Sequence, residues 1–152
     1  MIHWKTFSVE GADSIVARLD KLEASTQPLW GKMSVSKMVK HCQIPYLEIE
    51  GKIKRNPSLF MKIIMRILIK KKMIDDSLYA KNLPTAPHFI IDIDPDFEFE
   101  KEELKSKVLA LGITDHSDFE GRKHSLLGTL KASEWDTMLY KHIDHHLRQF
   151  GV

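Results

Sequence analysis

The chain has 152 residues, with 23 Lys and Arg against 21 Asp and Glu, eight histidines and one cysteine. This length predicts a single domain over residues 1–152, and 43% hydrophobic with 29% charged residues argues against a disordered chain. The lone cysteine, Cys42, excludes an internal disulfide and a zinc site built on paired cysteines. Imidazoles must therefore supply the ligands of any transition metal.

Two features bear on location. Residues 1–5 lack the apolar stretch and cleavage site of a secretory signal, so we expect a cytoplasmic protein. The main apolar concentration, residues 59–69, is about half as long as a membrane span and contains Lys62 and Arg66. We therefore expect no membrane span.

The first predicted helix covers residues 14–24. Ile15, Leu19 and Leu22 share one helical stripe, and Asp13 is a plausible N-cap. We expect this stripe to face the core.

The second predicted helix starts after Ser34 and ends near Gly51. Pro45 interrupts it, because proline has no N–H to donate and its ring presses against the carbonyl four residues back. That carbonyl belongs to His41. We therefore predict a kink beside His41.

A third amphipathic helix is predicted over residues 59–72. Residues 51–72 contain eight basic and no acidic residues, so a +8 segment adjoins a −6 remainder. The pattern favours a lid that packs its apolar side on the body and leaves its basic side in water. Alternatives are attraction of an anionic substrate, or contact with a membrane surface or nucleic acid. No nucleic-acid-binding fold is recognisable, and we expect no nucleic-acid partner.

The remaining elements complete an all-α pattern. We predict an extended loop over residues 81–87, a possible short strand over 89–93, a helix over 95–112 capped by Asp94, and a helix over 132–150. A glycine-containing polar loop separates the last two helices. Four principal helices, an additional basic helix and a long loop between the second and third main helices predict a four-helix bundle.

The last helix carries a stripe of histidines. With His142 at zero and about 100° per residue, His146 falls near +40°, Gln149 near −20° and His145 near −60°. Gln149 can therefore contact a bound ligand, and His145 is an outer neighbour or a dimer contact. Asp144, near −160°, is expected to face solvent and is a poor ligand candidate.

These histidines suggest a metal site. Two imidazoles four residues apart lie about 6 Å apart along one helix face and can reach the same cation. His41, on the buried stripe of the second helix, offers a third imidazole. Glu48 shares that stripe but lies about 10.5 Å further along the axis, so it is at most an outer contact. The alternative is a hydrogen-bonded structural cluster.

Three segments carry a resemblance to a known family. They are Trp30-Gly31-Lys32-Met33-Ser34 with Met38 and His41-Cys42, the loop Asn82-Leu83-Pro84-Thr85-Ala86-Pro87, and the C-terminal run from Tyr140 to Gly151. Together they resemble a domain-of-unknown-function branch of the DinB-like superfamily. The resemblance implies a four-helix bundle with a divalent metal on His41, His142 and His146. Ser125, Leu126 and Leu127 after His124 depart from the usual His-Pro-aromatic pattern, which leaves a role for His124 open.

A three-imidazole site leaves coordination positions for water or substrate, as catalytic sites do. Zinc or nickel is the expected ion, and iron or copper also suits imidazole. The resemblance implies a transferase that uses a low-molecular-weight thiol, or a hydrolase, acting on a small-molecule substrate, with homodimerisation as a further possibility. The contrasting hypothesis is a non-catalytic module that binds a ligand or partner, with the metal structural or absent. Cys42, beside His41, fits a small buried hydrophobe better than a nucleophile.

Overall fold

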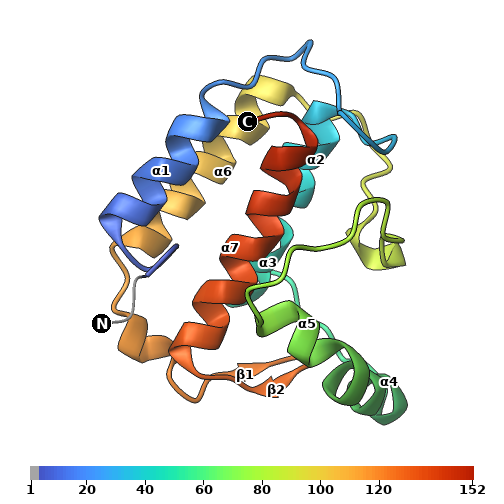
Figure 1. Cartoon of the computed structure of the whole chain (residues 1–152), viewed down its shortest axis with the longest axis vertical. Coiled ribbons are helices and arrows are strands. Elements are labelled where there is room, and N and C mark those ends of the chain that lie inside the picture. Colours follow the sequence, from blue (N-terminus) through green and yellow to red (C-terminus); the bar gives the residue numbers. More distant parts are fainter. Residues whose placement is uncertain (1–3) are drawn as a thin grey trace.

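The computed structural model describes residues 4–152, which are mostly helical (Figure 1). Residues 1–3, which include His3 and the start of the N-terminal segment considered above, lie outside this part. In chain order the elements are α1 (Val9–Leu19), α2 (Val35–His41), α3 (Ile44–Ile49), α4 (Leu59–Ile64), the π-helical turn η1 (Met65–Ile69), α5 (Lys70–Ile74), the short turn η2 (Pro87–Phe89), α6 (Phe97–Gly112), the turn η3 (His116–Phe119), β1 (Lys123–His124), β2 (Gly128–Thr129) and α7 (Ala132–Gln149). The predicted all-α class is confirmed.

Helix α1 begins earlier than we predicted. Ser8, not Asp13, is its N-cap, and the Ser8 hydroxyl accepts from the Gly11 N–H at 3.0 Å. Just before it, the Asp136 carboxylate accepts three successive backbone N–H groups, those of residues 5–7. A contact with a residue far away in the sequence therefore anchors the chain where α1 starts, and a local pattern cannot reveal it.

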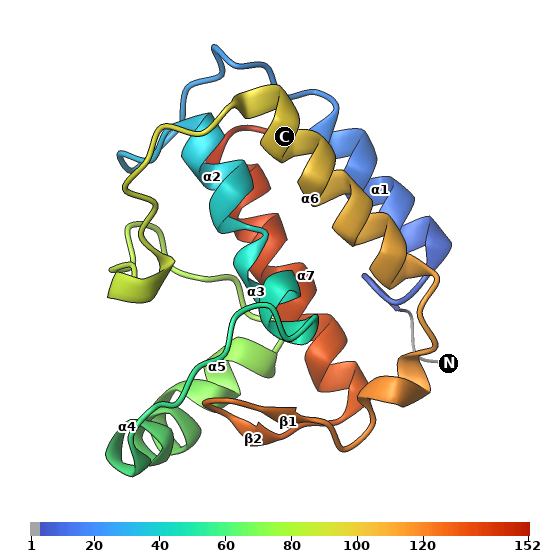
Figure 2. The same cartoon turned by 180° about the vertical axis from the view of Figure 1, so that it is seen from behind.

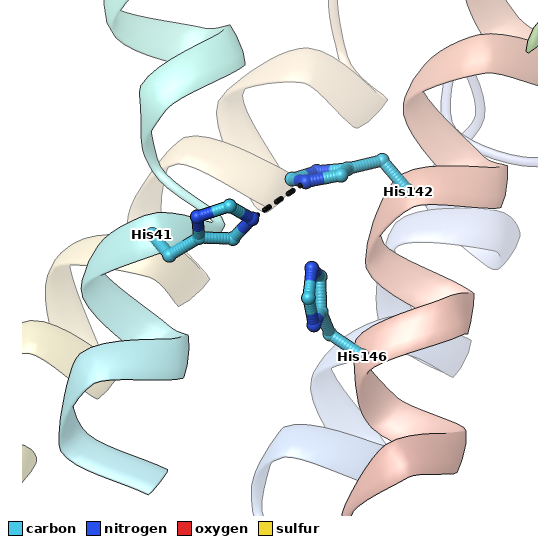
Figure 3. Close-up of side chains that lie close together, drawn as sticks. All are labelled: His41, His142 and His146. Carbon is cyan, nitrogen blue, oxygen red and sulfur yellow. Dashed lines mark hydrogen bonds between the residues drawn. The ribbon is translucent and has the colours of Figure 1, made fainter. Parts of the chain in front are cut away.

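The predicted kink in the second helix is present. The Ser34 hydroxyl accepts from the Lys37 N–H and caps α2, which ends at His41. Helix α3 restarts at Ile44 with Pro45 in its first turn, where a helix needs no N–H donor. The break places the His41 ring at the end of α2, directed toward α7 (Figure 3).

The core lies between the long helices. Helix α6 packs along α1 and also contacts α2, and α7 contacts α1 (Figures 1 and 2). Each of these helices contributes fully buried side chains, among them Leu19, Met38, Leu104 and Leu147. Gly112 allows a close approach of α6 to α1, since a Cβ there would lie 2.6 Å from the Ala12 Cβ. This packing fixes the facing sides of α2 and α7.

Two local predictions around α6 were wrong. In residues 4–152 only β1 and β2 form strands, paired antiparallel with Lys123 opposite Thr129. Residues 89–93 form no strand, because no other strand offers a partner for their backbone. Asp96, not Asp94, caps α6, and its carboxylate accepts from the Phe99 N–H at 2.8 Å.

The basic segment is helical over residues 59–74, two residues beyond the predicted end at residue 72. At its start the apolar side faces away from the protein, opposite to the prediction. Met65 and Met73 pack against the core, whereas Phe60 and Ile67 lie in solvent. Its basic side faces the β1–β2 hairpin, where the Lys70 ammonium donates to the Thr129 carbonyl at 3.3 Å. The prediction of a packed apolar side and a solvated basic side was therefore wrong for α4. No helix within residues 4–152 has the length and apolar character needed to cross a membrane.

Candidate metal centre

The three predicted ligands lie together between α2 and α7 (Figure 3). His41 comes from the end of α2, and His142 and His146 lie one turn apart on α7. The His41 and His142 Nε2 atoms are 3.0 Å apart, and one nitrogen from each of the three rings lies within 4.8 Å of the others. The kink in one helix and the four-residue spacing in the other thus converge on one point.

Hydrogen bonds orient two of the rings. The His41 Nδ1 lies 3.0 Å from the Phe89 carbonyl, and the His146 Nδ1 lies 2.9 Å from the Gln149 amide oxygen. The Gln149 amide nitrogen in turn donates to the Trp30 carbonyl at 2.9 Å, which sets the amide orientation. Because both Nδ1 atoms face acceptors, they carry the proton and leave each Nε2 with a lone pair.

Burial keeps these imidazoles neutral. It lowers the pKa of His41, and it lowers the pKa of His146 to about 3, with the nearby His41 adding to the effect. The pKa of His142 lies well below 6.5 because of burial, reinforced by His146 and His41. Neutral imidazole is the form that binds metal ions, so no proton must be removed at neutral pH before binding.

The donor set fits a divalent ion. Two imidazole nitrogens bound to one tetrahedral zinc ion at about 2.0–2.1 Å lie about 3.3–3.4 Å apart, which is close to the 3.0 Å between the His41 and His142 Nε2 atoms. Without an ion, the His142 Nε2 must carry a proton and donate a hydrogen bond to the His41 Nε2, because the His41 proton lies on Nδ1. The His146 nitrogen lies within 4.8 Å of the nitrogens of the other two rings.

An open cavity of about 490 Å³ adjoins the His146 side of the cluster. His145, His146 and Gln149 line it from α7, and Trp30 and Lys37 also line it. The loop predicted over residues 81–87 forms a further wall through Asn82, Leu83 and Thr85. Both predicted outer residues of the last helix thus lie here, with Gln149 bonded to a candidate ligand and the His145 ring centroid 5.2 Å from that of His146.

Glu48 lies away from the cluster. Its carboxylate forms an ion pair with Arg55, and it lines a separate cavity beside the hairpin. Arg55 stacks over the Phe89 ring at 4.5 Å from the ring centroid, and the Phe89 carbonyl faces His41. Glu48 therefore reaches the candidate centre only through this chain of contacts.

Cys42 is fully buried beside Met38, with its Sγ 3.7 Å from the Met38 sulfur. Burial raises the pKa of its thiol well above the ordinary range. A protonated thiol without solvent access is a poor nucleophile, as expected for a small buried hydrophobe.

His124 belongs to the hairpin and not to the cluster. Its Nδ1 accepts from the Leu126 and Leu127 N–H groups at 3.1 and 3.2 Å, which holds the turn. Burial lowers its pKa to about 4, and the adjacent positive charge of Arg55 contributes.

The prediction that Asp144 faces solvent was wrong. Its carboxylate is buried and accepts from Arg18 of α1 and from Arg148, both at 2.8 Å. Helix α7 therefore has two buried sides, one toward α2 with the histidines and one toward α1 with this ion pair. Asp144 is nevertheless not part of the three-histidine group.

Several contacts had no signal in the sequence. The Phe89 and Trp30 carbonyls that orient the site are backbone atoms of irregular segments, which no residue pattern marks. Arg18 lies on α1, far from its carboxylate partner in sequence. Its spacing of three residues from the buried Ile15 on α1 is the signal that could have placed it beside the core.

Fold and site together define a helical protein with three converging, neutral histidines beside an open cavity. Residues 1–151 match a family described as "Protein of unknown function (DUF1569)". The chain therefore belongs to the DUF1569 family. Comparison with curated proteins and with solved structures gives no match.

Proposed function

We propose that the protein is a DinB-like four-helix bundle that binds a divalent metal and acts as an enzyme on a small molecule. His41, His142 and His146 hold the ion, with zinc or nickel as the first candidates. The observation that carries the proposal is the convergence of three neutral imidazoles, two of them oriented through Nδ1. Structural histidine clusters do not need all these features at once.

The reaction is a transfer to a small thiol or a hydrolysis. A divalent ion on three imidazoles supplies a Lewis acid with free positions, where a thiol or a water becomes a stronger nucleophile at neutral pH. The chain's own thiol is excluded as nucleophile, because Cys42 is buried and protonated. The thiol or water of this proposal is therefore an external one.

The cavity beside His146 is the proposed substrate site. Its volume of about 490 Å³ falls within the range of small-molecule pockets. Trp30 and Leu83 offer apolar contacts, and Lys32 and Lys37 offer positive charge to an anionic substituent. Gln149 and the partly exposed His145 line this space beside His146, where they can contact the substrate.

The experiment is a turnover screen with protein purified without a histidine tag. Small thiols are paired with electrophiles in one arm, and esters and amides are tested in the other. We expect turnover that a chelator removes and that added zinc or nickel restores. His146→Ala should lose turnover, while Cys42→Ala should keep it. Turnover that survives both the chelator and His146→Ala would refute metal dependence, and turnover lost in Cys42→Ala alone would point to a cysteine mechanism.

A further inference from the structure

The first part of the basic segment exposes large apolar side chains. Leu59, Phe60 and Ile67 are each 72% exposed and Leu68 is 64% exposed. Helix α4 lies at one corner of the molecule, away from α1 and α6, in both views (Figures 1 and 2). Large exposed apolar side chains that gather on one short segment mark a contact with a protein or a membrane.

A basic cavity lies on another side of the same segment. It has a volume of about 630 Å³ between the segment and the hairpin, and its cationic lining consists of Arg55, Lys62, Arg66, Lys70 and Lys123. No acidic side chain lines it. Among residues 4–152, only Arg55 of these five forms an ion pair with a carboxylate, that of Glu48. The other four positive charges are free to meet an external anion.

Two details of the hairpin fit an anion site. The Ser125 hydroxyl is buried at the cavity wall and has no hydrogen-bond partner within the described chain. Gly128 lets the Arg66 guanidinium lie against the hairpin, because a Cβ there would lie 3.1 Å from its Cζ atom. A phosphate oxygen offers an acceptor to both groups.

The positive charge of the segment distinguishes between the possible binding partners of this surface. A second copy docked through the same face would bring one +8 segment against another, which is unfavourable at short range. A free phosphate would occupy the cavity but leave Phe60 and Ile67 in water. An anionic phospholipid surface supplies both partners, since its phosphates meet the cations and its acyl region meets the apolar side chains.

We propose that residues 55–74 and the β1–β2 hairpin form a docking site for an anionic phospholipid membrane surface. The exposed side of α4 enters the interfacial region, and lipid phosphates occupy the basic cavity. The segment lies on the membrane and does not cross it. Docking is independent of the metal centre and of any activity there.

The test is sedimentation of the full chain with sucrose-loaded vesicles. Vesicles of phosphatidylcholine and phosphatidylglycerol in equal parts should bind the protein at least about tenfold more tightly than phosphatidylcholine alone, and salt should weaken binding. Phe60→Ser combined with Ile67→Ser should weaken binding at least about tenfold. Arg66→Gln should weaken it about fivefold.

Two matched variants are the controls. Leu29→Ser removes an equally exposed leucine from another part of the surface, and Lys21→Gln removes one exposed charge outside the segment. Both should bind like the wild type. Equal binding to neutral vesicles, no binding to anionic ones, or equal losses in the controls would overturn the proposal.

Two further arms separate the other occupants. Analytical ultracentrifugation without lipid detects a dimer. If the double variant of Phe60 and Ile67 abolishes that dimer, the exposed apolar side of the segment binds a second copy of the chain. Titration with inorganic phosphate detects a soluble-anion site. Phosphate binding lost in Arg66→Gln, together with no vesicle binding, would assign the cavity to a soluble ligand. Either result overturns membrane docking.

Discussion

The histidine centre and the basic segment differ in where their apolar and polar side chains lie. In the histidine centre the polar groups lie inside, and the His41 and His146 rings each have a hydrogen-bond partner at Nδ1. In the segment over residues 59–74 apolar side chains lie outside, and cations line a cavity without carboxylates. Buried polar groups are costly unless they are satisfied, so the first region is organised around internal partners. The second region has unmatched groups of both kinds, which indicates that its partner is external.

The histidine centre should lose most of its metal affinity when one candidate ligand is removed. Even loss of an outer hydrogen-bond partner weakens metal binding 10- to 100-fold, so His142→Ala should weaken it by at least about 100-fold. Titration with zinc monitored by a competing chromophoric chelator measures this. His88→Ala, which removes an exposed histidine outside the cluster, is the matched control. Unchanged affinity in His142→Ala would remove that residue from the site.

Truncation of one isoleucine in each region compares their contributions to stability. Ile143 is 1% exposed in the core, so Ile143→Ala should lower the free energy of unfolding by about 2–5 kcal/mol. Ile67→Ala removes a solvent-exposed side chain and should change it by less than about 0.5 kcal/mol. Urea unfolding of the two variants measures both values. A large loss of unfolding free energy in Ile67→Ala would show that this side chain packs on the rest of the protein in solution. The two regions would then not differ in this respect.

The hydrogen bond from His146 to Gln149 should strengthen metal binding at the centre. Gln149→Met removes the acceptor at Nδ1 and should weaken metal binding about 10- to 100-fold. Gln149→Glu keeps an acceptor there and should retain most of the affinity. Equal affinities in the two variants would show that Gln149 does not orient His146.

The buried histidines should make the metal-free protein less stable in acid. The pKa of His146 is about 3 in the folded chain and near 6.5 when unfolded, so between these values the unfolded chain binds more protons. Stability should therefore fall as the pH drops below about 6.5, by up to about 1.4 kcal/mol per pH unit for each such group. Urea unfolding at a series of pH values, with chelator present, measures the slope. His146→Gln should have a shallower slope, and equal slopes would contradict the account.

The sequence predicted the candidate ligands because helical periodicity places side chains well. Two features are set by local sequence and do not depend on tertiary contacts. They are the spacing of His142 and His146, and the kink that Pro45 causes beside His41. The same periodicity misplaced Asp144, because it assumed one buried side, whereas Arg18 of α1 lies against the other. A pattern on one helix does not say how many neighbours surround that helix.

The basic segment shows a second limit of the same kind. Apolar residues at helical spacing, with basic residues every four positions, predicted a helix, and the helix is there. Amphipathicity does not determine which side of a helix meets the protein. Here the cations face the hairpin and Phe60 faces solvent. The start of α1 was missed for a related reason, since the Asp136 carboxylate that anchors the preceding residues lies on α7.

Metal analysis tests the central claim most directly. The protein is prepared without a histidine tag from cells grown with added zinc and nickel, and the bound metal per chain is measured beside His142→Ala. We predict one divalent ion per wild-type chain, and almost none in the variant. Wild-type protein that carries no metal and gains none when zinc or nickel is added would contradict the account, and would leave His41 and His142 as a hydrogen-bonded structural pair.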